Sequence, residues 1–427
     1  MSSSLGGSGG GLAAMMHELT NGAATGTGIV QLVPKVKKLL GLETVPSYLV
    51  DYATSVQHSL FGSYPTHKDI APSSIFTAVF VILMFAHTYI FVKNISRGHK
   101  FWLSIGFIFH ALLRWLGFAF RVRWAQDIQR LKIGIASEVF LIIPMVFLAS
   151  FNLVLAQRIF TWRHPHIGSK SWFWNAMILV YVIVIGVVVM GVLGAVIPYL
   201  YFLSEKRFSM CKKAAQAAAV LCTVYSLGAL LLVISAFVLP PSAAARQIWT
   251  FQPWWIESFG IFYFPPKNAA RDAEETFARR EPDSADAVRI IPSTTHYTNT
   301  LEKTQSVTSK SGKLGHNHSI FIICLTTLFL LVSSAFRCAS TFIDDTYANE
   351  SWIFRPVVMY IMFGLFEAIV SIIYLTSRVD LRFYRPDKIR KGICGSKKSE
   401  ADTFQDDRSR EDKPYTDILH NDHSSTE

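Results

Sequence analysis

The sequence predicts an all-α fold, an integral membrane bundle of seven transmembrane helices with disordered termini and a long loop between the fifth and sixth helices. Two observations predict it. Hydrophobic residues make up 51% of the 427 positions and charged residues only 17%, whereas a soluble globular chain has about 25% charged residues. The apolar residues also gather in seven runs of about 20 residues or more, the length that a helix needs to cross ~30 Å of hydrocarbon.

Each run must form a helix, because backbone groups left unpaired in lipid are very costly. The fourth run is long enough to tilt or to end in a kink at Pro198. Gly186, Gly191 and Gly194 in the same run are small enough to allow close contact with a neighbouring helix. The seven expected spans are residues 72–92, 101–120, 133–157, 174–203, 214–239, 318–341 and 353–377.

The spans divide the chain into five parts. We expect residues 1–70 to be extracellular and largely disordered, and their Gly- and Ser-rich start lacks the apolar core of a cleavable signal peptide. The long loop begins with an aromatic stretch, 249–266, which we expect to lie against the membrane face, and continues over 267–317 as a mobile polar segment. The parts are 1–70, helices 1–5 at 71–239, the cytoplasmic loop at 240–317, helices 6–7 at 318–378, and a basic then acidic cytoplasmic tail at 379–427.

Basic residues near the helix ends predict an amino terminus outside the cell and a carboxyl terminus in the cytoplasm, with the plasma membrane as the location. Lys and Arg resist translocation, and they are dense after the first and seventh spans, whereas the loop between the last two spans is acidic. The odd number of spans agrees with this orientation. Two groups oppose it, namely Arg121, Arg123, Arg130 and Lys132 after the second span and Lys206, Arg207, Lys212 and Lys213 after the fourth.

A glycosylation sequon gives an independent indication of orientation. Asn349 begins Asn-Glu-Ser in the loop assigned to the outside. A second sequon begins at Asn94, at the cytoplasmic membrane edge in this orientation. We expect Asn349 to be a glycosylation site, with chance occurrence of the sequon as the alternative, and Asn94 to remain unmodified.

Short blocks of residues at the helix ends carry a resemblance to a known family. The blocks are Arg97 to Phe101, Arg121 to Ala125, Asn152 with Ala156 to Arg158, Trp254 to Phe259 with Tyr263 to Pro265, Ser334 to Arg337, and Arg378 to Asp380 with Arg382 and Phe383. As a set, over about residues 66–390, they resemble a fungal family of seven-span membrane proteins of unknown function, often labelled family C-like G-protein-coupled receptors. The resemblance implies a multi-pass fold and a fungal source, and it implies no established chemistry.

Charged side chains within the spans are candidates for function, because a charge in lipid is costly and usually finds a partner inside the bundle. At ~1.5 Å rise per residue, Arg114 of the second span and Glu138 of the third lie at similar depth. We therefore expect an Arg114–Glu138 ion pair, with Arg337 of the sixth span near the same level. The alternative is that these long side chains reach the membrane surface without pairing.

A second set of polar residues lies deeper in the bundle: His87, His110, Asn152 and Glu367. A buried Glu beside a His can accept and pass protons, because loss of water favours the neutral carboxylic acid. This property is typical of transporters. The alternative is that Asn152 and Glu367 form hydrogen bonds between helices, worth about 1 kcal/mol each.

The sequence carries no signature of an enzyme, a cofactor or a metal. Its five cysteines are scattered without metal-site spacing, and its histidines lack the His-Glu-x-x-His pattern. Cys394, in a basic segment of the tail, is a candidate palmitoylation site, with a free thiol as the alternative. The net charge of +11 flanks the spans, which indicates membrane-surface attraction and no nucleic-acid partner.

Two hypotheses for function follow, from different classes. A receptor-like sensor would bind a small molecule or lipid and contact cytoplasmic proteins through residues 267–317 and the tail; a transporter would move a lipid or small molecule across the bilayer. A membrane-organising protein without a ligand is a third. A polar cavity reaching from Arg114 and Glu138 to Glu367 would favour transport, and a cavity open only at the outer end would favour a receptor.

Overall fold

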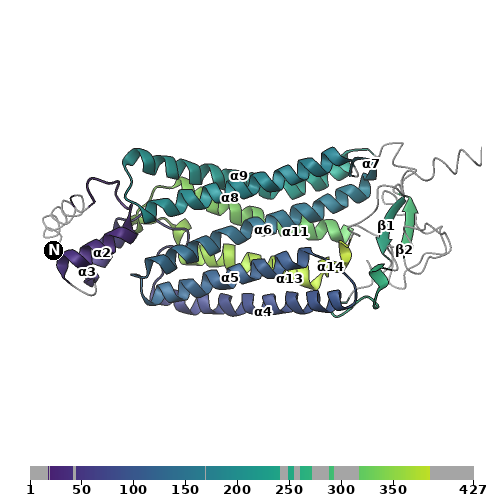
Figure 1. The fold of residues 1–427 in the computed structure, drawn as a ribbon, viewed down its shortest axis with the longest axis horizontal. Coiled ribbons are helices and arrows are strands. Elements are labelled where there is room, and N and C mark those ends of the chain that lie inside the picture. Colours follow the sequence, from purple (N-terminus) through teal and green to yellow (C-terminus); the bar gives the residue numbers. More distant parts are fainter. Residues whose placement is uncertain are drawn as a thin grey trace, which may run out of the picture.

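The protein forms an elongated bundle of antiparallel helices (Figure 1). Seven of the helices in the described part of the chain are long and apolar enough to cross a membrane, so the predicted all-α membrane fold is confirmed. The computed structural model describes residues 18, 20–41, 45–168, 170–240, 249–253, 260–271, 288–292 and 317–384.

Every expected span coincides with one of the seven helices. Helices α6 and α9 extend beyond the expected spans because polar residues at their ends continue the helical turns, so α6 has 33 residues and α9 has 34. By contrast, α8 ends at Leu200 and the seventh span begins at Pro356, three residues short of the expected bounds in each case. The seventh span contains a π-helical segment, η8, between two α-helical parts. The spans are η1 (His67–Asp69) with α4 (Ile70–Ser96), α5 (Leu103–Gln126), α6 (Leu131–Arg163), α8 (Ser171–Leu200), α9 (Glu205–Val238), α11 (Asn317–Phe342), and α12 (Pro356–Met359) with η8 (Tyr360–Leu365) and α13 (Phe366–Thr376).

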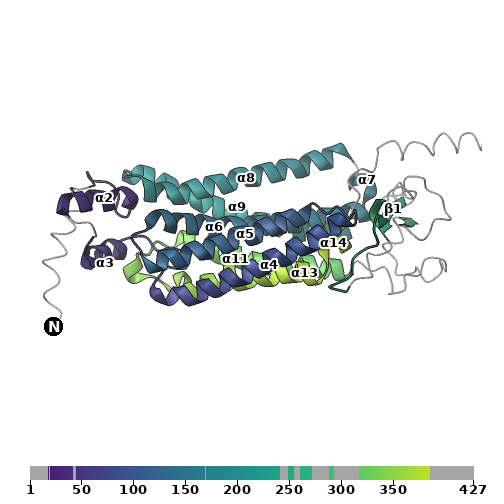
Figure 2. The same ribbon diagram turned by 60° about the horizontal axis from the view of Figure 1, so that its bottom comes forward.

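Helix α6 is the central helix of the bundle. It packs against α5, α8, α9 and α11, while α13 packs against α11 and α4. Helix α8 lies along one side of the bundle, where its main neighbour is α9 (Figure 2). The core between the helices is rich in aromatic side chains, including Phe80, Phe118 and Phe363.

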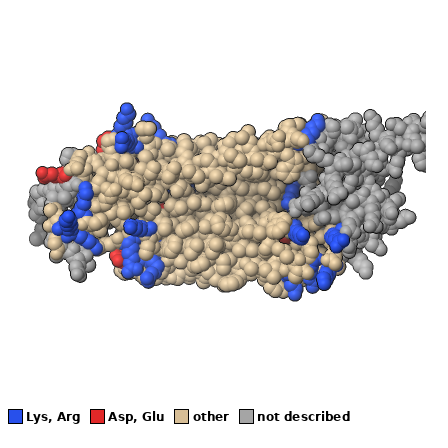
Figure 3. All heavy atoms as spheres, viewed as in Figure 1, with Lys and Arg blue, Asp and Glu red and all other residues tan. Residues whose placement is uncertain are grey.

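The outer surface of the bundle suits a hydrocarbon environment. Large apolar side chains such as Ile82, Phe85 and Ile185 are more than 60% exposed, which would be costly in water. Lys and Arg side chains gather near the two ends of the visible face, and the band between them carries almost none (Figure 3). This distribution is the one expected of a bundle that spans a bilayer.

The amino-terminal segment is more ordered than expected. We expected residues 1–70 to be largely disordered, but the structure places α2 (Ile29–Leu40) and α3 (Ser47–Ser55) at one end of the bundle, which we call the amino-terminal end. Leu32, Val36 and Leu49 pack together there as a small apolar cluster. The helical spacing of these apolar residues was the signal in the sequence.

The opposite end of the bundle carries a short antiparallel ladder and several helix-end contacts. Strands β1 (Trp249–Pro253) and β2 (Val288–Pro292) pair with Trp249 opposite Pro292. The aromatic stretch expected to lie along the membrane face therefore includes a strand, in keeping with its alternation of large aromatic and β-branched residues. Most of the expected mobile segment, 267–317, lies outside the described residues. Helices α7 (Pro165–Gly168) and α14 (Val379–Arg382) complete this end.

Two glycines of α8 give a matched test of the α8–α9 contact. A Cβ atom at Gly194 would lie 2.8 Å from the Cys211 carbonyl oxygen of α9, whereas a Cβ at Gly186 would meet nothing within 4 Å. We expect Gly194→Val to lower stability by about 1–3 kcal/mol, since rigid backbone must move apart, and Gly186→Val to leave it nearly unchanged. Thermal unfolding of the purified protein in detergent measures the difference. Equal melting temperatures for the two variants would show that this helix contact is loose.

Candidate functional site

A group of three ionisable side chains lies buried between α5 and α13. Arg114 Nε donates a hydrogen bond to Glu367 Oε2 at 2.6 Å, and a terminal guanidinium nitrogen donates to Oε1 of the same carboxylate. His110 Nε2 lies 2.8 Å from Glu367 Oε2. All three side chains are at most 1% exposed. His110 and Arg114 are four residues apart, so both project from one face of α5.

The partner of Arg114 differs from the one predicted. We expected Glu138, but Arg114 pairs with Glu367, and its remaining nitrogen donates to the Leu141 carbonyl oxygen of α6 at 2.6 Å. The guanidinium also lies 4.8 Å from the centre of the Phe363 ring. Arg114 lies level with Leu141, about one turn along α6 from Glu138, and α5 turns its side chain toward α13.

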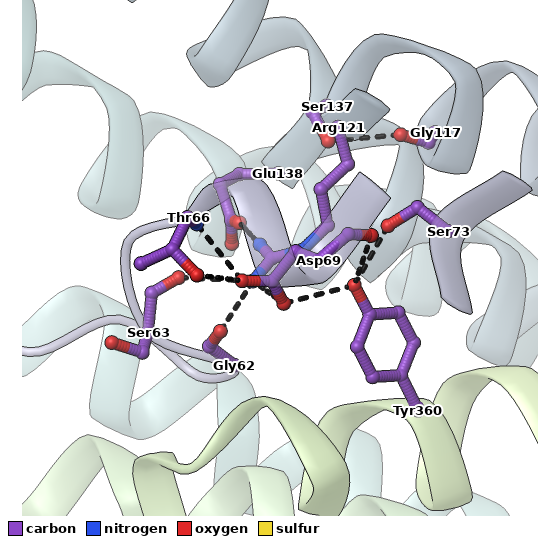
Figure 4. Close-up of polar contacts among 10 residues, drawn as sticks. All are labelled: Gly62, Ser63, Thr66, Asp69, Ser73, Gly117, Arg121, Ser137, Glu138 and Tyr360. Atoms are coloured by element: carbon purple, nitrogen blue, oxygen red, sulfur yellow. Dashed lines mark hydrogen bonds and ion pairs between the residues drawn. The ribbon is translucent and has the colours of Figure 1, made fainter. Parts of the chain in front are cut away.

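Glu138 belongs to a second network, centred on Arg121 (Figure 4). The Arg121 guanidinium donates to the Gly62 and Ser63 carbonyl oxygens and lies 3.6 Å from both the Asp69 and Glu138 carboxylates. Arg121 is fully buried. It follows Arg114 by two helical turns, so the two arginines share one face of α5.

Sequence reasoning missed this role, because Arg121 was counted among the basic residues at the membrane surface. His110, Arg114, Gly117 and Arg121 follow one another at spacings of four, three and four residues. That spacing marks one face of a helix and was the available signal. Ser137 donates to the Gly117 carbonyl oxygen at 2.9 Å, which holds α6 against this face.

Asp69 joins the network to the seventh span. Its Oδ2 accepts hydrogen bonds from the Thr66 backbone and hydroxyl at 2.9 and 3.0 Å, which caps the first span. Its Oδ1 accepts from the Tyr360 hydroxyl at 3.0 Å, and that hydroxyl also bonds Ser73 at 2.7 Å (Figure 4). Tyr360 begins the π-helical segment η8 and Glu367 follows it. The two networks are therefore connected through one short stretch of the seventh span.

The remaining deep polar residues are engaged in hydrogen bonds between helices. The Asn152 amide donates to Thr327 at 3.2 Å and accepts from Thr326 and Tyr374 at 3.0 and 2.6 Å. His87 Nε2 bonds the Ser371 hydroxyl at 2.9 Å. Their contacts match the interpretation as interhelical hydrogen bonds more closely than a role in proton transfer.

A cavity of about 180 Å³ opens among the helices at the amino-terminal end of the bundle. Glu138 and Arg337 line it, together with residues of the amino-terminal segment such as Gly26 and Tyr64. A smaller cavity of about 60 Å³ lies between α6, α8, α9 and α11 and is also lined by Arg337. Neither of the two is lined by Arg114, His110 or Glu367.

A charged cluster lines the larger cavity and joins His58 and Asp344, which lie outside the spans, to Lys212 near the start of α9. His58 Nδ1 lies 3.3 Å from Asp344, which also accepts from Lys212 at 2.6 Å. The Lys212 hydrogen bond holds the pKa of Asp344 below its usual value, and burial lowers the pKa of His58 despite the nearby carboxylate. These contacts tie the amino-terminal segment to α9 and to the loop after α11.

The two candidate modification sites have different outcomes. Asn349 is exposed in η6 (Tyr347–Asn349), at the amino-terminal end. Cys394 lies outside the described residues. Asn94, the sequon expected to remain unmodified, is 1% exposed and donates to Asp380 at 2.7 Å. In the described part of the chain, no group of three or more His, Cys, Asp or Glu residues is placed to hold a metal ion.

The apolar spans and the polar networks between them define a multi-pass integral membrane protein. Residues 165–384, more than half of the chain, match the model of a family described as "Protein of unknown function (DUF3112)", and the chain belongs to this family. No curated protein matches the sequence, and no solved structure matches it either. The matched part includes helices α8 to α13 and therefore contains Arg337 and Glu367, whereas Arg114 lies outside it.

Replacing only one residue of the Arg114–Glu367 ion pair should lower the stability of the protein strongly. Removal of one partner leaves an uncompensated charge in the bundle, which costs about 3–5 kcal/mol. We expect Arg114→Leu and Glu367→Leu each to lower the melting temperature markedly in detergent. The double variant leaves neither charge unpaired, so its loss in melting temperature should be smaller than the sum of the two single losses. Arg123→Leu, an exposed arginine of the same helix, is the control. Strictly additive losses would contradict the pairing.

Proposed function

We propose that this protein is a receptor-like membrane sensor that binds a small ligand in the cavity at the amino-terminal end of the bundle. The observation that carries the proposal is where the cavity ends. Glu138 and Arg337 line it, but the buried Arg114–Glu367 group does not. A conduit for transport needs a polar path through the middle of the bundle, and these residues are instead packed against one another.

The contacts beneath the cavity support a route by which a ligand could act on the bundle. Glu138 lies both at the cavity and beside Arg121, and Arg121 contacts Asp69, which accepts from Tyr360. Tyr360 opens the π-helical segment that leads to Glu367. A ligand that favours one arrangement of these contacts over another shifts the population of bundle conformations by that difference in affinity.

The proposal includes an orientation, with the amino terminus and the cavity outside the cell and the loop and tail in the cytoplasm at the plasma membrane. The exposed Asn349 at the cavity end supports it. In this orientation the cavity receives an extracellular ligand, and residues 267–317 and the tail contact cytoplasmic proteins. The proposal assigns no catalytic step to the protein.

Transport is the second candidate, and one observation favours it. His110 lies against Glu367 within hydrogen-bonding distance in a fully buried position. A carboxylate beside an imidazole inside a membrane is the arrangement found along proton relays. Under this alternative, water must reach Glu367 from at least one side of the bilayer during the working cycle.

Accessibility of introduced cysteines distinguishes the two. In a background with the five native cysteines replaced by serine, Ala195→Cys places a thiol in the cavity, and Ala368→Cys places one at the buried position that follows Glu367 in α13. A charged, membrane-impermeant thiol reagent is applied to intact cells or to inside-out vesicles. We expect Ala195→Cys to react only in intact cells and Ala368→Cys to react in neither preparation. Asn349→Cys, at an exposed position of the same end, is the control for labelling.

Each other outcome overturns part of the proposal. Reaction of Ala368→Cys from either side would establish a water-filled path to Glu367 and favour transport. Reaction of Ala195→Cys and Asn349→Cys only in inside-out vesicles would reverse the orientation. If Asn349→Cys reacts and Ala195→Cys does not, the cavity is closed to the reagent, which would contradict the binding site that the sensor proposal needs.

A further inference from the structure

We propose that the ligand is an uncharged single-ring compound with an amide edge, on which an N–H group and a carbonyl oxygen lie side by side. This inference rests on the proposed sensor function and adds the chemical class of its ligand. It follows from three features of the larger cavity, namely unused hydrogen-bonding groups of opposite kinds, balanced charges, and an aromatic lining of limited volume.

Two charged side chains that line the larger cavity have unused hydrogen-bonding capacity. The Glu138 carboxylate lies 3.6 Å from Arg121, beyond hydrogen-bonding distance, and its Oε1 has no hydrogen-bond partner among the described residues. The Arg337 guanidinium makes one long contact, 3.5 Å, to Ser340 on its own helix. Glu138 and Arg337 interact electrostatically without close contact. An ionised carboxylate can only accept hydrogen bonds and a guanidinium can only donate them, so a ligand that serves both needs a donor and an acceptor.

Gln57 of the amino-terminal segment adds a third unused group. Its side chain lines the cavity and is 3% exposed, and its carbonyl oxygen has no hydrogen-bond partner within the part of the chain that the structure describes. The Gln57 backbone is held by the Tyr347 amide at 2.9 Å, which leaves the side chain for another partner. A buried polar group without a partner is costly, so a ligand that supplies a donor to this oxygen gains affinity.

The charges around the cavity favour a ligand with no net charge. Lys212 is paired with Asp344 at 2.6 Å, and Asp345 accepts two hydrogen bonds within its own loop. Glu138 and Arg337 remain, with opposite charges. An anion at Arg337 would be repelled by Glu138, and a cation at Glu138 would be repelled by Arg337. An amide avoids both repulsions, because it can donate to the carboxylate and accept from the guanidinium.

Aromatic side chains line much of the cavity, and its volume limits the ligand to one ring. Tyr64 and Trp124 form an edge-to-face pair there, with ring centres 5.8 Å apart. Such rings favour stacked or edge-to-face contact with another ring. An apolar cavity of about 150 Å³ holds one benzene molecule, so a cavity of about 180 Å³ suits one six-membered ring with a small substituent. The aromatic lining consists of Phe61, Tyr64, Trp124, Tyr199, Phe208 and Phe354.

Four probes of similar shape test this class. Benzamide carries a donor and an acceptor without charge, benzoate is an anion that only accepts, benzamidine is a cation that only donates, and toluene does neither. Binding is measured by saturation-transfer NMR on the purified full-length protein in nanodiscs of phosphatidylcholine. We expect benzamide to bind at least about tenfold more tightly than each of the other three, because it alone can serve Glu138 and Arg337 together.

Uracil, as a fifth probe, distinguishes two sources of the amide edge. Its amide groups are part of the ring, whereas the amide of benzamide is attached to the ring. Tighter binding of uracil than of benzamide supports the class and identifies a heterocyclic base. The reverse order supports the class and identifies a ring carboxamide.

Three variants test the roles of the polar side chains. Glu138→Gln should strengthen benzoate relative to benzamide by at least about tenfold, since the repelling carboxylate is gone, and Arg337→Gln should do the same for benzamidine. Gln57→Leu should weaken benzamide about 2- to 10-fold and leave toluene unchanged. A purely structural role would weaken all probes alike. Arg355→Gln, an exposed arginine at the same end, is the control.

A matched pair of variants tests the place of binding. Val139 lines the cavity, so Val139→Trp should fill it and abolish benzamide binding. Val189 on α8 is 52% exposed, and Val189→Trp should retain binding. The Val139→Trp nanodiscs also give the signal of benzamide dissolved in the lipid. A single symmetric peak in size exclusion verifies that each variant is folded.

Four results would overturn the inference. They are binding of benzoate, benzamidine or toluene as tightly as benzamide, an unchanged order of the probes in both Glu138→Gln and Arg337→Gln, unchanged benzamide binding in Val139→Trp, and no binding of any probe. None of these results depends on the labelling of Ala195→Cys, so the sensor function can stand when the ligand class is wrong.

Discussion

The need to compensate buried cations organises this bundle. Helix α5 brings His110, Arg114 and Arg121 into the interior on one face, and neither arginine can remain charged there without partners. The position of α13 follows from the first arginine, because Glu367 must reach it. The positions of the amino-terminal segment and of α6 follow from the second, because Gly62, Ser63, Asp69 and Glu138 surround it.

This requirement also explains why the cavity exists where it does. The carbonyl oxygens of Gly62 and Ser63 must be held over the end of α5 to bond Arg121, so the preceding residues are drawn across the bundle. Residues 57–59 then pair with the loop after α11, where the Ser59 amide donates to the Asp345 carbonyl oxygen at 2.9 Å. The space enclosed beneath them, between α6, α8 and α9, is the larger cavity.

The sequence allowed the spans to be predicted, but not the pairs within them. Hydropathy and length determine which residues enter the membrane and how deep each lies, and on that basis all seven spans were found. Pairing depends on how each helix is rotated and which helix is its neighbour. Arg114 and Glu138 were expected to pair from their positions along the spans, yet α5 directs Arg114 toward Glu367, a residue more than 250 positions away in the chain. The amphipathic helix α2 was missed because its helical spacing of apolar residues extends over only 12 residues and follows a Gly- and Ser-rich stretch.

The π-helical segment gives this arrangement a physical means of changing. A π turn accommodates one more residue than an α turn, and an α-helix rotates about 100° per residue. Tyr360 at its start contacts Asp69, and Glu367 just beyond it contacts Arg114. If η8 became regular α-helix, one end would rotate by about 100° relative to the other, and one of these two contacts would be lost. The two networks are therefore satisfied together only while the extra residue is present, so a change in the contacts of Arg121 and Asp69 would act on the geometry of the seventh span as a whole.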